Sequence, residues 1–544
     1  MIKKSISLIL VFAVVLCIGG CGKSKKSNSN IADSDNTVKK HSPSCITLLF
    51  NKTDSLNPYT AKTENNRLVA KLIFEPLVKT DNNLQPVNRL AESVKLEGRN
   101  CTVTLKNAVF SDQSPVTASD VVYSYNLAKG YGGLYTAHLY EVTSVSAISD
   151  NTVSFNLSMA DPYFANLLDF PILKSGSDKI TDSDGTAKTP IGCGRYTPAD
   201  EPFLLKQNAS FFGTKGDIKE IKLIHAPDSD SVSHYIEIGA TDFYYSDFSG
   251  NNIVRMSGSR TDVNLNTLIY LGVNTFSPVL KEKYLRYAVS SAIDRKALCK
   301  DAFFDSATPA SGYFSPALAE ARAVQSLKPT SDLQITVDNL SKMGYNDRNQ
   351  DGYFVDRNGN RIVLRLLVNK ESQSKLIAAK LIAEQLKSAG IEVKITECGY
   401  AEFVRLISAN AFDLYLGEIS VLPNFDLTQL VIKGGSVAYG LNNEKPDETK
   451  PDGEQTEKTQ DGNENNGDDT ASTDDRGDSP VKLIYDEFRS GTASISDVAG
   501  TLITEMPQIP LLFKHGILFS NESIQNITVS ECDIFFSAEN YKIK

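Results

Sequence analysis

The stretch Ile362–Ile395, which reads IVLRLLVNKESQSKLIAAKLIAEQLKSAGIEVKI, decides the fold class of this chain. It begins with an apolar run at 362–368 that suits a buried strand and continues into an amphipathic segment at 374–388 that is typical of a helix. Gly390 follows at a position where glycine commonly ends a helix. A second strand pattern at 391–395 completes a strand–helix–strand unit, which predicts parallel strands joined by a right-handed crossover.

Strand and helix patterns also alternate in the first part of the chain. Strand patterns occur at Cys45–Phe50, Thr102–Leu105 and Thr152–Leu157, and an apolar helical pattern occurs at Leu68–Leu77. A further helix is expected to begin at Thr117, because Asp120 follows it at the spacing of a capping box. The sequence therefore predicts two mixed α/β domains.

The formal net charge of −10 argues against a nucleic-acid partner, since binding to phosphates needs a basic surface. Almost all of this charge comes from Glu444–Asp478, which contains 13 acidic and 4 basic residues. Ala471 is the only apolar side chain of the segment. This composition favours a solvated, disordered insertion in a surface loop, with an acidic interaction arm as the alternative. Without the insertion the chain is nearly neutral.

The N-terminus reads as a secretion signal. Lys3 and Lys4 precede an uncharged run, Ile6–Ile18, which is too short to span a bilayer as a helix. The following Gly19-Gly20-Cys21 resembles the lipobox of bacterial lipoproteins, which implies that residues 1–20 are removed and that Cys21 carries a lipid anchor to the membrane. The alternative is an ordinary secretory signal with an incidental cysteine. Residues 21–44 are polar and predict a flexible tether.

No pattern of cysteines or histidines indicates a catalytic or metal site, so we expect neither an enzyme nor a cofactor. The cysteines that remain after Cys21 are widely scattered: Cys45, Cys101, Cys193, Cys299, Cys398 and Cys532. They are expected to be buried or free thiols, although secretion would permit disulfides. Asp347–Gly352 copies the first half of an EF-hand loop, but Asn358 stands where the ligating Glu belongs, which predicts a polar turn.

Several short motifs follow one another along the chain, and the most specific is Phe110–Val121, FSDQSPVTASDV. The others are LNPY at 56–59, LIFEPLV at 72–78, LAES at 90–93, PIGCGRY at 190–196, GVNT at 272–275, LRYA at 285–288 and AIDR at 292–295. In this order they resemble the extracellular solute-binding proteins of family 5, which bind oligopeptides, dipeptides or nickel. Gln113 stands where that family usually has Gly, and Val94 where it has Trp.

The resemblance implies an α/β fold of two lobes, like a periplasmic binding protein of type II and of the large cluster, with an extra subdomain in lobe 1. Lobe 1 is expected at 45–270 and includes a β-rich subdomain, lobe 2 at 271–508, and a return to lobe 1 at 509–544. The chain would cross near Leu271–Asn274 and return near Pro507–Phe513. A hinge of a few residues would let the lobes close on a ligand.

The resemblance also implies an ABC permease and ATPase as partners, a monomeric protein, and a peptide as ligand. Nickel chelate, haem, sugar, or a sensing role without transport remain alternatives. Peptide binders of the family hold the ligand's amine with an Asp in a stretch matched here by Phe412–Asp426, which lacks the family's Trp and has shifted acidic positions. The candidate ligand-binding residues are Asp426, Glu418, Asn424, Asn274 and Tyr59. Asp426 could instead cap a helix at 427–430.

Overall fold

A computed structural model describes residues 44–131, 133–247, 257–441, 479–530 and 533–544. All of these residues belong to one compact unit. The signal, most of the predicted tether and the acidic insertion lie outside the described residues. Within the described part of the chain, no helix is long and apolar enough to cross a membrane.

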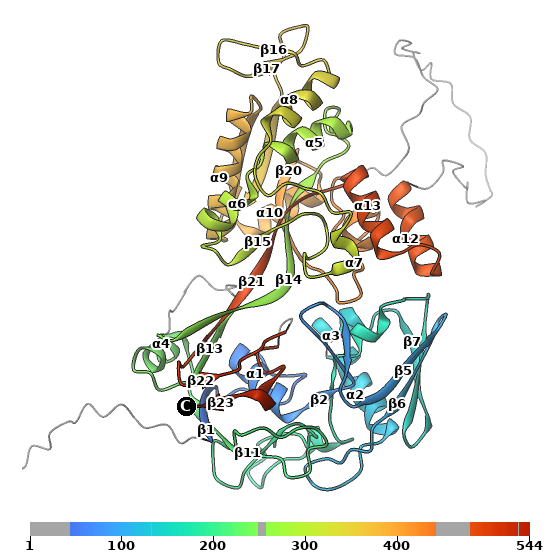
Figure 1. Cartoon of the computed structure of the whole chain (residues 1–544), viewed down its shortest axis with the longest axis vertical. Helices are drawn as coiled ribbons and strands as arrows, with labels where there is room; N and C mark the ends of the chain where they lie inside the picture. Colours follow the sequence, from blue (N-terminus) through green and yellow to red (C-terminus); the bar gives the residue numbers. More distant parts are fainter. Residues whose placement is uncertain (1–43, 132, 248–256, 442–478, 531–532) are drawn as a thin grey trace, which may run out of the picture. The chain divides into compact units, whose positions relative to one another are not determined.

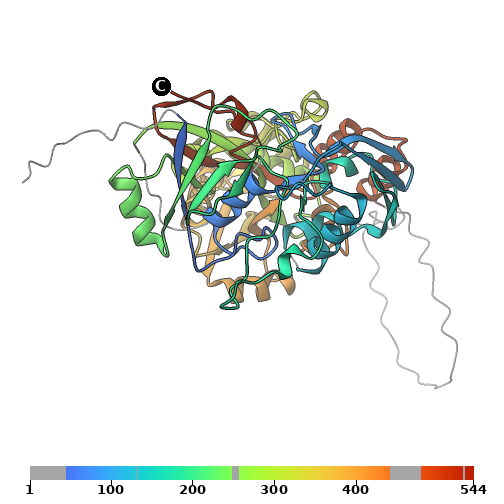
Figure 2. The ribbon, with the colours of Figure 1, turned by 90° about the horizontal axis from the view of Figure 1, so that it is seen from below.

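Lobe 1 is built on a four-stranded sheet in the order β1-β12-β11-β10, seen from below in Figure 2. The strands are β1 (Cys45–Phe50), β12 (Glu220–His225), β11 (Leu204–Gln207) and β10 (Tyr196–Pro198), and β1 runs parallel to β12. Helix α1 (Glu64–Ile73) shares a core with β1 through the buried side chains of Leu48 and Leu72. Helix α4 (Ser229–Glu237) follows β12.

Helix α1 begins and ends earlier than the apolar pattern at Leu68–Leu77 predicted. Its first turn is polar, and the side chain of Thr63 accepts a hydrogen bond from the backbone N–H of Asn66, so the apolar pattern gives no sign of this start. Phe74 is already extended, and β2 (Glu75–Pro76) pairs with β9 (Pro171–Ile172). The helix therefore ends at Ile73, and the chain continues in extended conformation into β2.

The β-rich subdomain of lobe 1 is a second four-stranded sheet in the order β5-β6-β8-β7. Its strands are β5 (Ala91–Glu97), β6 (Asn100–Leu105), β8 (Thr152–Leu157) and β7 (Val142–Ser149). Helix α2 (Ala118–Gly130) shares this sheet's core, and the capping box predicted for Thr117 and Asp120 is present at its start. Two further elements of the region are β3 (Val78–Thr80) and β4 (Pro86–Asn88), and α3 (Leu134–His138) follows α2.

The segment Pro190–Tyr196 needs its glycines because it runs directly against the end of α1. A Cβ atom at Gly192 would lie 2.2 Å from the carbonyl oxygen of Ile73, and one at Gly194 would lie 2.4 Å from the carbonyl carbon of the same residue. The N–H of Gly194 donates to that oxygen at 2.8 Å. Glycine at both positions therefore allows the segment to close the lobe 1 core.

The central sheet of the protein has seven strands, six of them in the order β13-β21-β14-β20-β18-β19, and β15 also pairs with β21. The strands are β13 (Phe243–Ser246), β21 (Ile509–Ser520), β14 (Ser259–Val273), β20 (Leu414–Ser420), β18 (Val363–Asn369), β19 (Glu392–Cys398) and β15 (Ala307–Pro309). The predicted strand–helix–strand unit is confirmed, since β18 is parallel to β19 and α9 (Gln373–Ser388) connects them. Gly390 has a φ of 87°, which glycine adopts without strain.

The helices of lobe 2 pack on both faces of this sheet, because successive residues of a strand point to opposite faces. On β14, Ile269 and Leu271 belong to the core beneath α5 and α9, whereas Leu268 and Tyr270 belong to the core beneath α10, α12 and α13. The helices are α5 (Lys283–Ala292), α6 (Arg295–Ala297), α7 (Ala319–Arg322), α8 (Leu333–Lys342), α10 (Tyr400–Ser408), α11 (Thr428–Val431), α12 (Pro480–Ser490) and α13 (Ile495–Glu505). The predicted polar turn lies between β16 (Asp347–Arg348) and β17 (Phe354–Val355).

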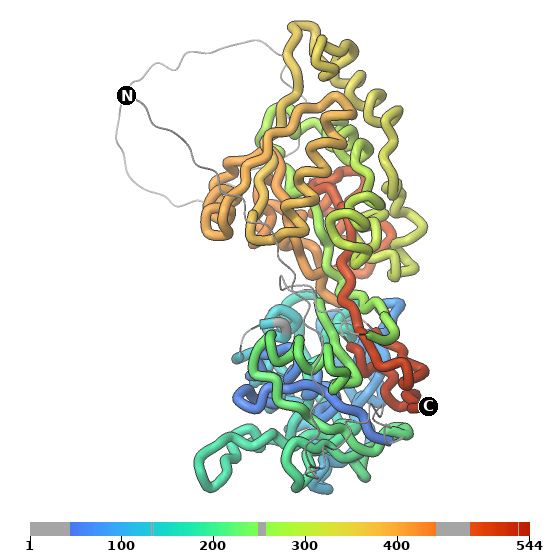
Figure 3. Tube along the Cα trace, turned by 90° about the vertical axis from the view of Figure 1, so that its left-hand side faces the viewer, coloured from blue at the N-terminus to red at the C-terminus, as the bar shows by residue number. Residues whose placement is uncertain are grey.

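Strands β14 and β21 lie side by side and run from one lobe into the other (Figures 1 and 3). Their pairing shifts register between Asn264 and Thr267. Val263, before the shift, is buried in the lobe 1 core, whereas Leu268, after it, is buried in lobe 2. The first crossing therefore precedes the predicted segment 271–274, which already belongs to lobe 2. The sequence does not reveal this position, because an unbroken strand carries no turn signal where it crosses.

Candidate functional site

The parallel strands β18, β19 and β20 end at the same edge of the lobe 2 sheet, at Asn369, Cys398 and Ser420. In open parallel sheets, ligands bind outside the carboxyl ends of the strands. Ser420 pairs with Thr267, which lies where β14 crosses between the lobes. This C-terminal edge therefore faces the junction at which a two-lobed protein would hold its ligand, and we take it as the candidate site.

One carboxylate and two ammonium groups meet beside this edge. Glu418, on β20, lies 2.7 Å from the Nζ of Lys375 and 2.9 Å from the Nζ of Lys514. Burial disfavours the ionised carboxylate, but the charges of the two lysines outweigh it and hold the pKa of Glu418 below its usual value. The side chain of Glu418 keeps 30% of its surface exposed, so the cluster is accessible to a solute.

The surroundings of the cluster can receive an anion as well as a cation. Lys375 lies in the first turn of α9, where the unpaired backbone N–H groups and the helix dipole favour negative charge. Tyr400, at the start of α10 on the same edge, is 60% exposed and offers a flat apolar surface. The arrangement can therefore hold a zwitterion, with its amine at Glu418 and its carboxylate at the lysines.

Asp426 lies outside this cluster and is already bound by groups of the chain. One carboxylate oxygen lies 2.5 Å from Nη2 of Arg489, and the other accepts the N–H of Thr428 at 2.8 Å, at the start of α11. Nη1 of Arg489 lies 2.6 Å from Glu141 in the β-rich subdomain. A ligand amine could reach Asp426 in this conformation only by displacing Arg489, so its role in binding stays a prediction.

Asn424 connects lobe 2 to the β-rich subdomain. Its amide donates to Asp161 at 2.8 Å, and the amide of Asn166 donates to the carbonyl of Pro423 at 2.8 Å. Burial raises the pKa of Asp161 to about 6, because its ionised form is poorly solvated at this interface. Asn424 and Asp426 thus lie in a contact between lobe 2 and the subdomain.

Asn274 and Tyr59 are also engaged within the chain. The amide of Asn274 donates to the carbonyls of Asn410 and Phe412, at 3.1 and 2.8 Å, inside lobe 2. The hydroxyl of Tyr59 donates to the carbonyl of Pro171 within lobe 1. Both residues support the fold in this conformation, and their contact with a ligand stays a prediction.

Lys375 and Lys514 were missed in the sequence, because each is unremarkable among its neighbours. Lys375 reads as the polar face of an amphipathic helix, and 139 positions separate it from Lys514. The one available signal was a lysine within the apolar run 509–518. Only the topology, which places β21 two strands from β20, brings both lysines to Glu418.

No group of three or more His, Cys, Asp or Glu that could hold a metal ion occurs among the described residues. The described cysteines, Cys45, Cys101, Cys193, Cys299 and Cys398, are all buried free thiols. The predicted thiol state is confirmed for these five, and Cys532 lies outside the described residues.

Two α/β lobes joined by crossing strands, with a charged sheet edge at their junction, define a two-lobed solute-binding protein. The family model of bacterial extracellular solute-binding proteins, family 5 Middle, matches residues 85–434, and the chain belongs to this family. The family consists of solute-binding proteins and not of enzymes, as the sequence predicted.

Three known proteins illustrate the likeness. The Oligopeptide-binding protein AppA of Bacillus subtilis (strain 168) is 25% identical over 474 residues, which cover 80% of this chain and 84% of that protein. A solved structure of a nickel ABC transporter from Bacillus halodurans has a TM-score of 0.70 and 17% identity over 92% of this chain and 100% of its own. A structure of the Bacillus subtilis AppA with a nonapeptide has a TM-score of 0.55 and 19% identity, with the same coverage. The two structural likenesses concern the fold.

Proposed function

We propose that this protein captures a peptide between its lobes, outside the membrane, and delivers it as a monomer to an ABC permease and ATPase. The observation that carries the proposal is the position of Glu418 between Lys375 and Lys514 at the C-terminal edge of the lobe 2 strands. A peptide with free termini has an ammonium group that can pair with Glu418 and a carboxylate that can pair with the lysines. The oligopeptide-binding relative that covers 80% of this chain supports the same ligand class.

Recognition would proceed by exchange of partners at Glu418. Without ligand, both lysines pair with the carboxylate, and among the described residues neither lysine has another carboxylate at ion-pair distance. A peptide's ammonium group would replace one lysine at Glu418, and that lysine would become available to a carboxylate of the peptide. Closure about the register shift between Asn264 and Thr267 would then desolvate these pairs, and pairs shielded from water are stronger.

The experiment is to identify what the purified protein carries and then to measure binding of defined peptides. Native mass spectrometry of the protein as isolated should show bound peptide masses. Calorimetry should show that a peptide with a free N-terminus binds about tenfold or more tightly than its N-acetylated form, because a charge-assisted hydrogen bond is lost on acetylation. A nickel–histidine chelate serves as the competing ligand class. Binding of the chelate without binding of peptides would contradict the proposal.

We further propose that Cys21 carries a lipid that anchors the protein at the outer face of the cell membrane. The order of a charged start, an apolar run, Gly19-Gly20 and Cys21 supports this anchor. Two acyl chains give stable attachment to a bilayer, whereas one gives only marginal binding. These residues lie outside the described part of the chain, so fractionation of cells is the direct test.

A further inference from the structure

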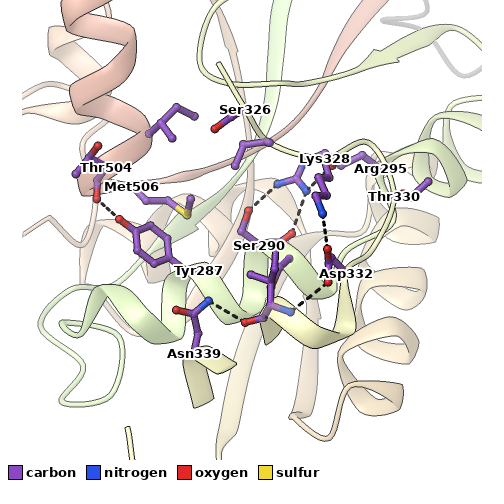
Figure 4. Close-up of a pocket in the computed structure, with 14 residues that line it drawn as sticks. Tyr287, Ser290, Arg295, Ser326, Lys328, Thr330, Asp332, Asn339, Thr504 and Met506 are labelled. Carbon is purple, nitrogen blue, oxygen red and sulfur yellow. Dashed lines mark hydrogen bonds and ion pairs between the residues drawn. The ribbon is translucent and has the colours of Figure 1, made fainter. Parts of the chain in front are cut away.

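Lobe 2 contains a cavity of about 300 Å³ that shares no residue with the C-terminal edge (Figure 4). It lies among helix α5, helix α8, the end of α13 and the loop 326–332. Its size is at the lower end of the range of pockets that bind small molecules. The cavity is therefore a candidate binding site for a ligand other than the one proposed to bind between the lobes.

A buried arginine without a counter-ion lines this cavity. The side chain of Arg295 is almost fully buried, at 1% exposure, and no carboxylate lies within ion-pair distance of it in the parts of the chain that the structure describes. Its bonds go to the carbonyls of Pro510, Ser290 and Lys328 and to the hydroxyl of Ser290, at 2.8 to 3.5 Å. These bonds use four of the five guanidinium N–H groups. One N–H on Nη2 therefore has no acceptor among the described residues.

The charge around the cavity is unbalanced toward positive. Burial alone lowers the pKa of Arg295 to about 10, which reflects the cost of its uncompensated charge. Asp332, the one carboxylate among the lining residues, is paired with Lys328 at 2.5 Å and also accepts the N–H of Ile335. Arg286, whose Nε donates to the carbonyl of Met506 on the cavity wall, has no carboxylate at ion-pair distance among the described residues, although the charges of Glu505 and Glu282 favour its charged form. An anion placed in the cavity would offset this excess.

The remaining wall is largely apolar. Leu327, Ile335, Ile503 and Met506 contribute hydrocarbon or thioether surface, and Ser326 is an exposed residue of the lining. Polar residues line it as well, among them Ser291, Thr330, Asn339 and Thr504, but most of the lining surface is apolar. Apolar surface does not replace the water that a strongly hydrated ion such as phosphate would lose. It suits a ligand that joins an anionic head to an apolar body.

We propose that this cavity is a second binding site, which takes a small amphipathic carboxylate. The carboxylate would accept the remaining N–H of Arg295 and the hydroxyl of Ser290, and the hydrocarbon would contact Met506 and its apolar neighbours. Figure 4 shows the guanidinium of Arg295 directed toward Ser290 among the lining side chains. The site is independent of the proposed peptide site and would bind its ligand whether or not peptide is present.

Octanoate is the test probe, and octanamide is its neutral control. Calorimetry on the mature protein should show octanoate binding at millimolar concentration or below, about tenfold or more tightly than octanamide, as expected for a hydrogen bond to a charged group. Ser326→Trp places a bulky side chain at an exposed lining residue outside the core, and it should weaken octanoate binding by about tenfold or more while the Tm stays unchanged.

Arg295→Met separates charge recognition from simple filling of the cavity. This variant replaces a buried cation by an apolar side chain of similar length, and it should bind octanoate and octanamide about equally. Three results would each overturn the proposal: no octanoate binding at millimolar concentration, unchanged binding in Ser326→Trp, or competition between octanoate and peptide. The first two remove the site, and the third places the probe between the lobes.

Discussion

The guanidinium of Arg489 lies 2.5 Å from the carboxylate of Asp426, where the sequence had predicted the amine of a ligand. Burial opposes the charge of Arg489, but Asp426 and Glu141 outweigh it and raise the pKa of this arginine above its usual value. Because Glu141 belongs to the β-rich subdomain and Asp426 to lobe 2, Arg489 joins the two. In this conformation the pair therefore contributes to cohesion between lobe 2 and the subdomain.

Asp426→Asn should destabilise the protein and leave peptide affinity nearly unchanged. Removing one partner of a buried ion pair costs about 3 to 5 kcal/mol, and the lower end is expected because Arg489 keeps Glu141. Urea unfolding followed by circular dichroism measures the stability, since the chain has no Trp for fluorescence. Calorimetry measures the affinity.

Asp486→Asn provides the matched control on helix α12, which also carries Arg489. Asp486 pairs with Lys482 at 2.9 Å, but both side chains are about half exposed, so its loss should cost less than about 1 kcal/mol. If Asp426→Asn instead abolished peptide binding at unchanged stability, Asp426 would be the amine ligand after all.

Glu418→Gln should weaken binding of a peptide with a free N-terminus by about 2 to 5 kcal/mol, the range for losing one partner of a buried charge pair. The N-acetylated form of the same peptide should lose much less, because it has no ammonium group to pair with Glu418. Glu201→Gln is the matched control, since Glu201 forms an exposed pair with Lys206 in lobe 1. Equal losses for both peptides would assign Glu418 to the fold alone.

The sequence predicted those parts of the fold that depend on residues close together in the chain. The strand–helix–strand unit at 362–395 and the capping box at Thr117 depend on residues a few positions apart, so periodicity and spacing reveal them. The start of α1 was missed because its polar first turn, Glu64 to Asn66, carries no apolar signal.

The candidate site could be predicted only in part, because its contacts are long-range. Glu418 and Asp426 were identified as acidic residues near the end of a strand, yet their partners decide their roles. Arg489 follows Asp426 by 63 positions, and Lys514 follows Glu418 by 96. No local sequence pattern distinguishes a carboxylate that is paired with an arginine from one that is accessible to a ligand. Only the packed structure shows which of the two each residue is.

The described cysteines should resist thiol reagents in the native state. Burial raises the pKa of Cys101 and of Cys299 to about 12, so at neutral pH both are protonated and unreactive as well as shielded. Native alkylation with iodoacetamide, read by peptide mass spectrometry, should leave these two unmodified, whereas alkylation in urea should label both. A reducing agent should leave the Tm unchanged. Rapid native labelling of Cys101 would contradict the buried position.

Cys21→Ser should release the protein from the membrane into the soluble or extracellular fraction. Without the thiol no diacylglyceryl group can be attached, and the described part of the chain holds no helix able to span a bilayer. Radiolabelled palmitate should enter the wild type and not the variant. Cys45→Ser is the control, since its thiol is buried in lobe 1 and should not affect fractionation. A variant that stays wholly with membranes would require another anchor.

The contact between Asp161 and Asn424 should make stability depend on pH. Burial, reinforced by the charge of Glu141, raises the pKa of Asp161 from 3.8 to about 6, although the hydrogen bond from Asn424 opposes the shift. The folded protein therefore holds the proton more tightly than the unfolded chain does. The stability that this proton contributes is fully present below about pH 4 and is lost as the pH rises through 6. A shift of about two units corresponds to about 3 kcal/mol.

Asp161→Asn isolates this contribution, because asparagine does not titrate and other carboxylates change equally in both proteins. The free energy of unfolding of the wild type minus that of Asp161→Asn should fall by about 2 to 3 kcal/mol between pH 4 and pH 7. Urea unfolding at four pH values, followed by circular dichroism, gives this difference directly. Loss of a hydrogen bond in the variant shifts the difference by a constant and leaves its pH dependence intact. A difference that stays flat, or that grows with pH, would show that Asp161 is ionised in the fold at its ordinary pKa or below.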